Sequence, residues 1–212
     1  MPTAAETPNQ STLYYIYDPM CSWCYAFRPI WQQVQQLLSD RIRVKTVLGG
    51  LAPDTAEPMP LATQSMVQAN WYKIMQTVPG TEFNFSFWTT CQPRRSTYPA
   101  CRAVLATELQ QAQTGQAMLT AIQNAYYLQA RNPADTTTLI ELTTEIGLDT
   151  TRFVSDLNSS TIQEQLKENL ALADQLGVHS FPSLILQTKD QLFRIQHSYT
   201  DASAILQQLN QA

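Results

Sequence analysis

The chain has 212 residues, 44% of them hydrophobic and 14% charged, and its formal net charge is −4. This length allows one large domain or a small domain with an insertion, and the composition excludes a largely disordered protein, because disordered chains are rich in charge and poor in aromatic residues. The negative charge and the single adjacent basic pair, Arg94-Arg95, argue against binding to nucleic acid or to an anionic membrane surface.

The sequence predicts a cytoplasmic protein. No apolar run approaches the roughly 18 residues that span a bilayer. A secretory signal begins with positive charge followed by an apolar stretch, whereas Met1–Gln10 is polar and the first basic residue is Arg28. In a reducing compartment, four cysteines point to catalysis or metal binding before structural disulfides.

The first fifty residues predict a strand, a helix and a second strand. Residues Leu13–Tyr17 are aromatic and aliphatic and end at Asp18-Pro19, as a short buried strand does. After Cys21-Ser22-Trp23-Cys24, apolar residues recur every three or four positions, which predicts a helix that the cysteine pair opens. Residues Ile42–Leu48 form the second predicted strand, so the unit is of the βαβ kind.

The middle of the chain is predicted to be helical, and the C-terminal part returns to strands. The predicted helices cover 61–77, 99–113, 116–131, 136–146, 150–157 and 160–176, and Asp135 is a predicted N-cap. Two strands are predicted at 183–187 and 192–196, followed by a helix that begins at Asp201. The two chain ends must therefore fold together around a helical insertion.

The pair Cys21 and Cys24 carries the predicted chemistry. Unpaired N–H groups and partial positive charge at a helix N-terminus stabilise a thiolate, which makes Cys21 the predicted nucleophile. Cys24, one turn further into the helix, is predicted to be more buried and placed to attack a mixed disulfide at Cys21, releasing the substrate.

A half-site for zinc or an iron–sulfur cluster is the alternative interpretation of this motif. Such sites usually need a second Cys-x-x-Cys or closely spaced histidines. Cys91 and Cys101 are ten residues apart, and the chain has 2 histidines. We therefore predict no metal at Cys21 and Cys24.

A second motif, Gly-Val-x-x-Phe-Pro-Ser around Phe181-Pro182, precedes the third predicted strand. Together with the segment from Tyr14 to Ile30 and the helical insertion, it resembles the DsbA-like family of thioredoxin-fold oxidoreductases, most closely the cytoplasmic FrnE-type branch. The resemblance implies an α/β protein whose thioredoxin fold, residues 12–51 and 171–212, is interrupted by an all-helical domain, residues 52–170.

The resemblance also implies a cis Phe181-Pro182 bond beside the cysteine pair, where the backbone of Phe181 hydrogen-bonds to an extended substrate peptide. Two departures from the family matter. Ser22-Trp23 replaces the Pro-His pair of strongly oxidising periplasmic members, so extreme acidity of Cys21 is not implied. Phe181 is bulkier than the usual Thr or Val, which leaves the width of the substrate groove open.

Four further residues have a functional and a structural interpretation. Asp18 either caps the helix or exchanges protons with Cys24, or it forms a plain Asp-Pro turn. Trp23 either contacts substrate protein or is a partly packed aromatic residue. Arg94 and Arg95, in a segment that faces the redox centre in similar proteins, either attract an acidic substrate such as glutathione or are surface charge beside a helix capped by Ser96 or Thr97. Cys101 is predicted to be a buried, inert thiol.

The leading functional prediction is a thiol-disulfide oxidoreductase that reduces, oxidises or isomerises disulfides of proteins or small molecules, without a dissociable cofactor and with glutathione as a candidate co-substrate. The alternative is a glutathione-dependent isomerase or transferase, similar to hydroxychromene-carboxylate isomerases and kappa-class transferases. Those proteins usually keep one nucleophile, whereas both cysteines are present here. A third interpretation is a non-enzymatic peptide-binding module that uses the surface around Trp23 and Phe181.

Overall fold

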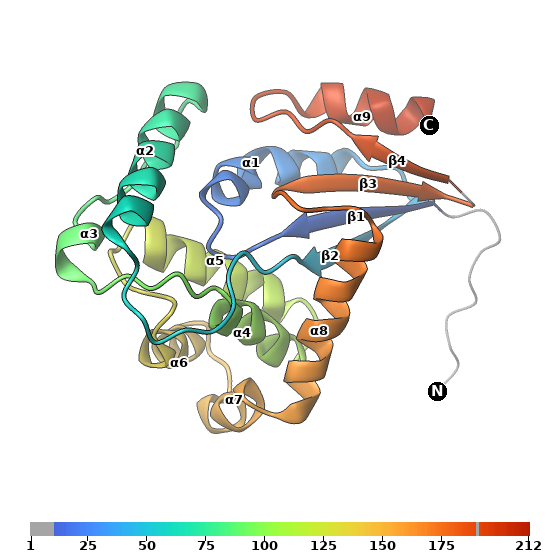
Figure 1. Ribbon diagram of the computed structural model, residues 1–212. Coiled ribbons are helices and arrows are strands. Elements are labelled where there is room, and N and C mark those ends of the chain that lie inside the picture. The colour runs from blue at the N-terminus through green and yellow to red at the C-terminus, as the bar shows by residue number, and fades with distance from the viewer. Residues whose placement is uncertain (1–10, 190) are drawn as a thin grey trace.

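The computed structural model describes residues 11–189 and 191–212 (Figure 1). The polar segment Met1–Gln10, on which the prediction of a missing secretory signal rests, lies outside the described residues. Within the described ranges, no helix is long and apolar enough to cross a membrane.

The two ends of the chain build one four-stranded sheet in the order β2-β1-β3-β4. β1 (Ser11–Tyr17) and β2 (Ile42–Leu48) run parallel. β3 (Ser183–Thr188) lies antiparallel to β1, and β4 (Gln191–Ile195) lies antiparallel to β3. The N-terminal βα unit and the C-terminal hairpin thus share one sheet, as the sequence predicted.

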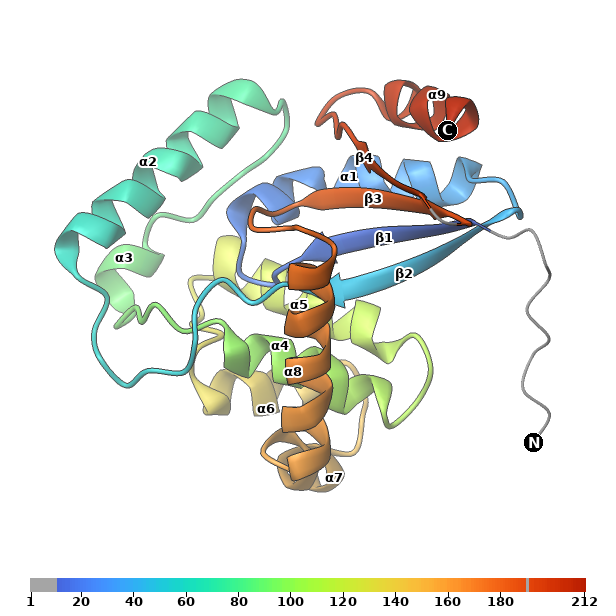
Figure 2. The same cartoon turned by 45° about the vertical axis from the view of Figure 1, so that its right-hand side comes forward.

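Helices lie on both sides of this sheet. In chain order they are α1 (Ser22–Leu37), α2 (Leu61–Thr77), α3 (Phe87–Thr90), α4 (Tyr98–Glu108), α5 (Thr114–Tyr127), α6 (Thr136–Glu145), α7 (Thr150–Leu157), α8 (Ser160–Gln175) and α9 (Ala202–Gln211). Figure 2 shows α9 beside β4 and α4 and α5 beyond β2, at the opposite edge of the sheet.

The alternation of side chains along β1 determines which helix covers which face. The ring centroid of Tyr15 lies 4.5 Å from that of Trp31 on α1. Ile16 points to the opposite face, where it packs with Ala173 of α8. Strand β1 is therefore buried on both faces, in keeping with its nearly continuous apolar sequence.

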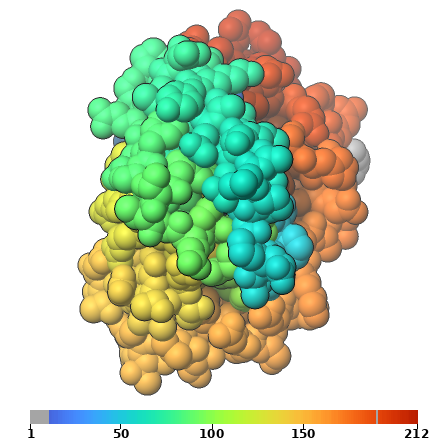
Figure 3. All heavy atoms as spheres, turned by 60° about the vertical axis from the view of Figure 1, so that its left-hand side comes forward, coloured from blue at the N-terminus to red at the C-terminus, as the bar shows by residue number. Residues whose placement is uncertain are grey.

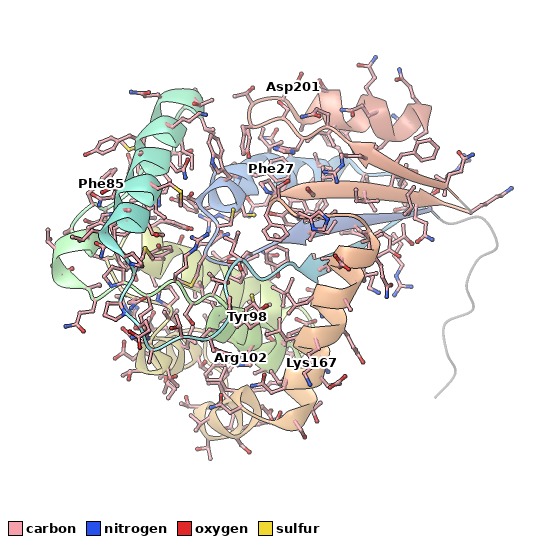
Figure 4. All side chains as sticks on the ribbon, in the orientation of Figure 1. Phe27, Phe85, Tyr98, Arg102, Lys167 and Asp201 are labelled. Carbon is pink, nitrogen blue, oxygen red and sulfur yellow. The ribbon has the colours of Figure 1, made fainter. Side chains whose placement is uncertain are left out.

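An aromatic cluster holds the outer part of the helical insertion together. Trp71 on α2 is fully buried, and its ring stacks on Phe83 at a centroid distance of 4.9 Å. Its other ring neighbours are Phe85, Phe87, Trp88, Tyr126 and Tyr127. Figure 4 labels Phe85 beside α2, and Figure 3 shows the outer surface of α2 and α3. The cluster joins α2 and α3 to the end of α5.

The structure differs from the sequence-based prediction at α3 and at the break between α4 and α5. α3 was not predicted, since its four residues are too short to show a helical period. α4 ends at Glu108, five residues before the predicted end, because the Glu108 carboxylate accepts the N–H groups of Gln113 and Gly115. Gln113 takes a left-handed conformation with φ 71°, which separates the two helices.

Replacing Trp71 by alanine tests the aromatic cluster. We expect Trp71→Ala to lower the free energy of unfolding by about 3–5 kcal/mol, because it leaves a cavity among packed rings. The neighbouring variant Tyr72→Ala is the control. Tyr72 is 56% exposed and stacks on Phe85, so its loss should cost at most about 1.5 kcal/mol. Urea unfolding of both variants measures this, and equal losses would contradict the assignment.

Candidate active site

Cys21 lies at the N-terminus of α1, as predicted. The chain turns after β1, and the backbone N–H of Cys21 donates to the Asp18 carbonyl at 3.1 Å. Cys21 is the N-cap of α1 with extended backbone, and its carbonyl accepts from the Tyr25 N–H. Cys21 is 7% exposed and Cys24 is fully buried, and both are free thiols. Cys21 is therefore the sulfur nearer to the surface.

The loop before β3 meets the cysteine pair. The Phe181-Pro182 peptide bond is cis. The Cys21 Sγ donates to the carbonyl oxygen of Phe181 at 3.6 Å, across 160 residues of sequence. A substrate that reacts at Cys21 would therefore meet the backbone of this loop.

The carboxylate of Asp18 is fully buried and accepts hydrogen bonds from three segments. Its Oδ1 accepts from the Met20 N–H at 2.8 Å. Its Oδ2 accepts from the Leu51 N–H at 2.7 Å and from the Thr97 hydroxyl at 2.6 Å, and the Cys101 Sγ lies 3.8 Å away. Asp18 thus joins the β1–α1 turn, the exit of β2 and the start of α4.

The prediction that the side chain of Ser96 or Thr97 caps α4 is wrong. Thr97 is the N-cap residue, but its side chain makes no capping hydrogen bond and donates to Asp18 instead. The Ser96 hydroxyl accepts from the Thr55 N–H at 3.3 Å. Sequence reasoning did not identify the hydrogen bond from Thr97 to Asp18. A threonine just before a helix is typical of an N-cap, and the sequence does not show that a distant carboxylate accepts a hydrogen bond from its hydroxyl instead.

Burial governs the protonation of the groups behind Cys21. Burial raises the pKa of Asp18 above its ordinary value, although the hydrogen bonds from Thr97, Leu51 and Met20 oppose the rise. Burial, with a further contribution from Cys21, raises the pKa of the Cys24 thiol well above its ordinary value. Cys24 is therefore protonated near neutral pH and needs a proton acceptor before it can attack a disulfide.

Trp23 and Phe181 flank Cys21 and are both half-buried. The Trp23 ring centroid lies 5.1 Å from that of Tyr199, in the loop before α9. Phe181 packs against two hydrophobic clusters, one on each face of the sheet. Each ring therefore has intramolecular partners and still reaches the surface beside the cysteine pair.

The two adjacent arginines have different surroundings. Arg94 donates to the Ala134 carbonyl at 2.5 Å and to the Asp135 carboxylate at 2.6 Å. Asp135 accordingly makes no side-chain cap on α6, contrary to the sequence-based prediction. In the described part of the chain, no hydrogen bond or ion pair holds the guanidinium of Arg95, whose charge counteracts the rise in the pKa of Asp18.

The other two cysteines have no disulfide partner. Cys101 is fully buried, as predicted, and burial followed by the nearby Asp18 carboxylate raises its pKa well above the ordinary value. The Cys91 Sγ donates to the Ala130 carbonyl at 3.0 Å. Across residues 11–189 and 191–212, no group of three or more His, Cys, Asp or Glu side chains could hold a metal ion.

The variant Asp18→Asn tests the burial of this carboxyl. Burial raises the pKa of Asp18 in the folded chain, so the folded state binds its proton more tightly than the unfolded state. The free energy of unfolding should therefore fall as pH rises from about 4 through the folded pKa. Asparagine cannot ionise, and Asp18→Asn should lose this part of the pH dependence.

Urea unfolding from about pH 3 to 8 measures the difference between the two proteins. Asp174→Asn, which replaces an exposed aspartate on α8, should leave the pH dependence of the parent chain in place. An Asp18→Asn variant with an unchanged pH dependence would contradict the assignment.

Comparison with known proteins places this geometry in a family. A family model described as thioredoxin matches residues 14–200. Among curated proteins, the ClpXP adapter protein SpxH of Halalkalibacterium halodurans is 26% identical over 177 residues, which are 82% of this chain and 57% of that protein. The chain thus spans less than three fifths of this relative's length.

Two solved structures resemble nearly the whole chain. A protein of Nitrosomonas europaea, provisionally assigned as a protein disulfide isomerase, is 27% identical with a TM-score of 0.82 and coverage of 95% of this chain and 97% of that one. The cytosolic disulfide reductase DsbM of Pseudomonas aeruginosa is 27% identical with a TM-score of 0.75 over 95% and 100%. The structure of DsbM with glutathione matches with a TM-score of 0.67 over 84% and 89%. The chain therefore belongs to the thioredoxin family, with the DsbA-like combination of a thioredoxin fold and a helical insertion that the sequence predicted.

Proposed function

We propose that this chain is a thiol-disulfide oxidoreductase that acts through Cys21 and Cys24. The observation that carries the proposal is the position of Cys21 at the N-terminus of α1, with its Sγ 3.6 Å from the Phe181 carbonyl and Cys24 fully buried one turn behind it. The structural similarity to a disulfide reductase supports it. We further propose that residues 12–51 and 171–212 form the thioredoxin-like domain and that residues 52–170 form the helical insertion.

The exchange proceeds in two steps. The Cys21 thiolate attacks one sulfur of a substrate disulfide, forms a mixed disulfide and releases the first substrate thiolate. Cys24 then loses its proton and attacks the Cys21 sulfur, which releases the second thiolate and leaves a Cys21–Cys24 disulfide. Two electrons pass to the substrate. The reverse sequence oxidises a substrate dithiol, and the relative reduction potentials determine the direction.

Asp18 is the proposed proton acceptor for Cys24. The Cys24 thiol is protonated in its buried environment, and it interacts electrostatically with the Asp18 carboxylate. Asp18 is itself buried with a raised pKa, so it holds a proton more readily than an exposed aspartate would. The acid can take the Cys24 proton when the mixed disulfide is resolved and return it in the reverse step.

We propose that substrates contact the half-buried side chains of Trp23, Phe181 and Arg95 and the backbone beside the buried Pro182. A cavity of about 1040 Å³ lies between β2 and the helices α4 and α5, and neither cysteine of the pair lines it. We therefore infer that substrates bind Cys21 on the open surface, which suits proteins and small disulfides. Glutathione is a proposed co-substrate, in keeping with the structure of DsbM with glutathione. No dissociable cofactor, nucleic acid or membrane partner is needed for this chemistry.

We further propose a cytoplasmic location. The similar reductase DsbM is named as cytosolic. A reducing compartment would keep Cys91 and Cys101 as thiols, so that only Cys21 and Cys24 cycle.

The two cysteine variants separate the proposed roles. Cys24→Ser should trap a mixed disulfide at Cys21 with a substrate such as insulin, because the resolving thiol is absent. Cys21→Ser should abolish insulin reduction and trap nothing. Cys91→Ser, which changes a thiol bonded to the Ala130 carbonyl, is the control and should retain the parent activity. Mass spectrometry of non-reduced peptides identifies the trapped cysteine.

Peptide mapping and a glutathione conjugation assay together discriminate between the candidate functions. A linked peptide that contains Cys91 or Cys101 in place of Cys21 would contradict the proposed nucleophile. A chain that conjugates glutathione to an electrophile without reducing insulin would instead support the isomerase or transferase alternative.

An adapter role is the second candidate function. The curated relative is named as a ClpXP adapter protein. The observation that favours this role is the set of large apolar side chains exposed on α2, namely Leu61, Met66, Tyr72 and Met75. Two results together would favour the adapter role. The parent chain would exchange no disulfide, and the variant with both Cys21 and Cys24 replaced by serine would still bind the partner protein.

Variants of Arg95 and Arg94 test whether the guanidinium of Arg95 binds a carboxylate of an acidic substrate. Arg95→Ala should raise the KM for glutathione disulfide about three- to tenfold, because one charge interaction with a substrate carboxylate is lost. Arg94 is occupied by Asp135 and Ala134, so Arg94→Ala should change that KM by less than about twofold. Steady-state kinetics measures both, and equal effects would argue against a binding role for Arg95.

A further inference from the structure

We propose that Gly49 is a positioning residue that determines which substrates reach Cys21, an inference that rests on the proposed exchange at this cysteine. A Cβ atom added to Gly49 would lie 2.0 Å from Cε1 and 2.1 Å from Cζ of Phe181. The Phe181 ring therefore occupies the space that any other side chain at position 49 would fill. Because Gly49 has no side chain, the ring of Phe181, whose carbonyl contacts Cys21, can lie against its backbone.

The lack of a side chain, and not the backbone conformation, is the reason for glycine at this position. The next residue, Gly50, has a φ of +60°, which already favours glycine. Gly49 has no such positive φ. The close approach of the Phe181 ring is the feature that position 49 has to accommodate.

Gly49 cannot move away from the ring. Its N–H donates to the Tyr17 carbonyl at 2.7 Å, which extends the pairing of β1 with β2. Two residues later, the Leu51 N–H donates to the buried Asp18 carboxylate at 2.7 Å. The backbone on either side of Gly49 is therefore held by hydrogen bonds to the β1 end of the sheet.

The backbone around Phe181 is also held in place. Its carbonyl accepts from the Cys21 Sγ at 3.6 Å. Ser183, two residues later, pairs with Ile16 in the sheet. A Cβ atom at position 49 would therefore displace the aromatic ring and leave both backbones in place.

The buried side chains against which Phe181 packs leave no room for the ring on the inner side. A displaced ring would therefore move outward, to the surface beside Cys21, whose Sγ contacts the carbonyl of the same residue. There it would obstruct an extended peptide chain more than a small disulfide. The lack of a side chain at Gly49 thus allows the bulky Phe181 ring to leave the substrate surface open. Position 49 therefore determines how large a substrate can reach Cys21.

The variant Gly49→Ala tests this with insulin as the bulky substrate and bis(2-hydroxyethyl) disulfide as the small one. We expect exchange with insulin to slow about tenfold or more and exchange with the small disulfide to change less than about threefold, since only the longer chain needs the obstructed space. In a Phe181→Val background, adding Gly49→Ala should change both rates by less than about twofold, because no ring remains to be displaced. Circular dichroism and thermal unfolding establish the folded fraction of each variant.

Equal losses with the two substrates, or a loss that persists in the Phe181→Val background, would overturn the proposal. If the parent chain reduces neither substrate, the proposed function fails, and alkylation of Cys21 still tests Gly49. In a Cys24→Ser background, Gly49→Ala should slow a bulky maleimide about tenfold while iodoacetamide reacts at its parent rate within about twofold. Equal slowing of both reagents would then refute the role of Gly49 independently of redox activity.

Discussion

The side-chain oxygens of Asp18 hold together three chain segments that meet behind the redox pair. An ionised carboxylate removed from water costs several kcal/mol unless hydrogen bonds replace its hydration. Here the Met20 and Leu51 N–H groups and the Thr97 hydroxyl supply them. Because each donor comes from a different segment, the carboxylate is satisfied only when the β1–α1 turn, the end of β2 and the start of α4 are all in place. The helical insertion is thereby tied to the site and not merely attached beside it.

Two buried thiols, Cys24 and Cys101, lie in similar surroundings near this carboxylate. Burial raises the pKa of both Cys24 and Cys101, and both interact with Asp18. Cys24 lies one helical turn from Cys21, whereas Cys101 lies on α4. Proximity to Cys21, and not acidity, therefore distinguishes Cys24, the proposed resolving thiol, from Cys101.

Local signals in the sequence were sufficient for the strands, the long helices and the cysteine pair. The apolar run of β1 and the spacing of Cys21 and Cys24 are properties of short segments, so they can be interpreted without a fold. The bond from Thr97 to Asp18 joins residues 79 positions apart, and the pair Arg94–Asp135 joins residues 41 apart. Such contacts depend on how helices pack, and a single sequence does not show packing. Sequence reasoning therefore assigned the arginines one role, although their surroundings differ.

The order of strands in the sheet bears on how the chain is made. β1 pairs with β3, and Leu13 faces Leu186 across the helical insertion. At about 5–20 residues per second, synthesis of the chain between Leu13 and its partner Leu186 takes about 9–35 seconds. Throughout this interval one edge of β1 is unpaired and Cys21 lacks the Phe181 loop beside it. The nascent chain therefore carries the proposed nucleophile on an unfinished sheet until β3 is available to pair with β1.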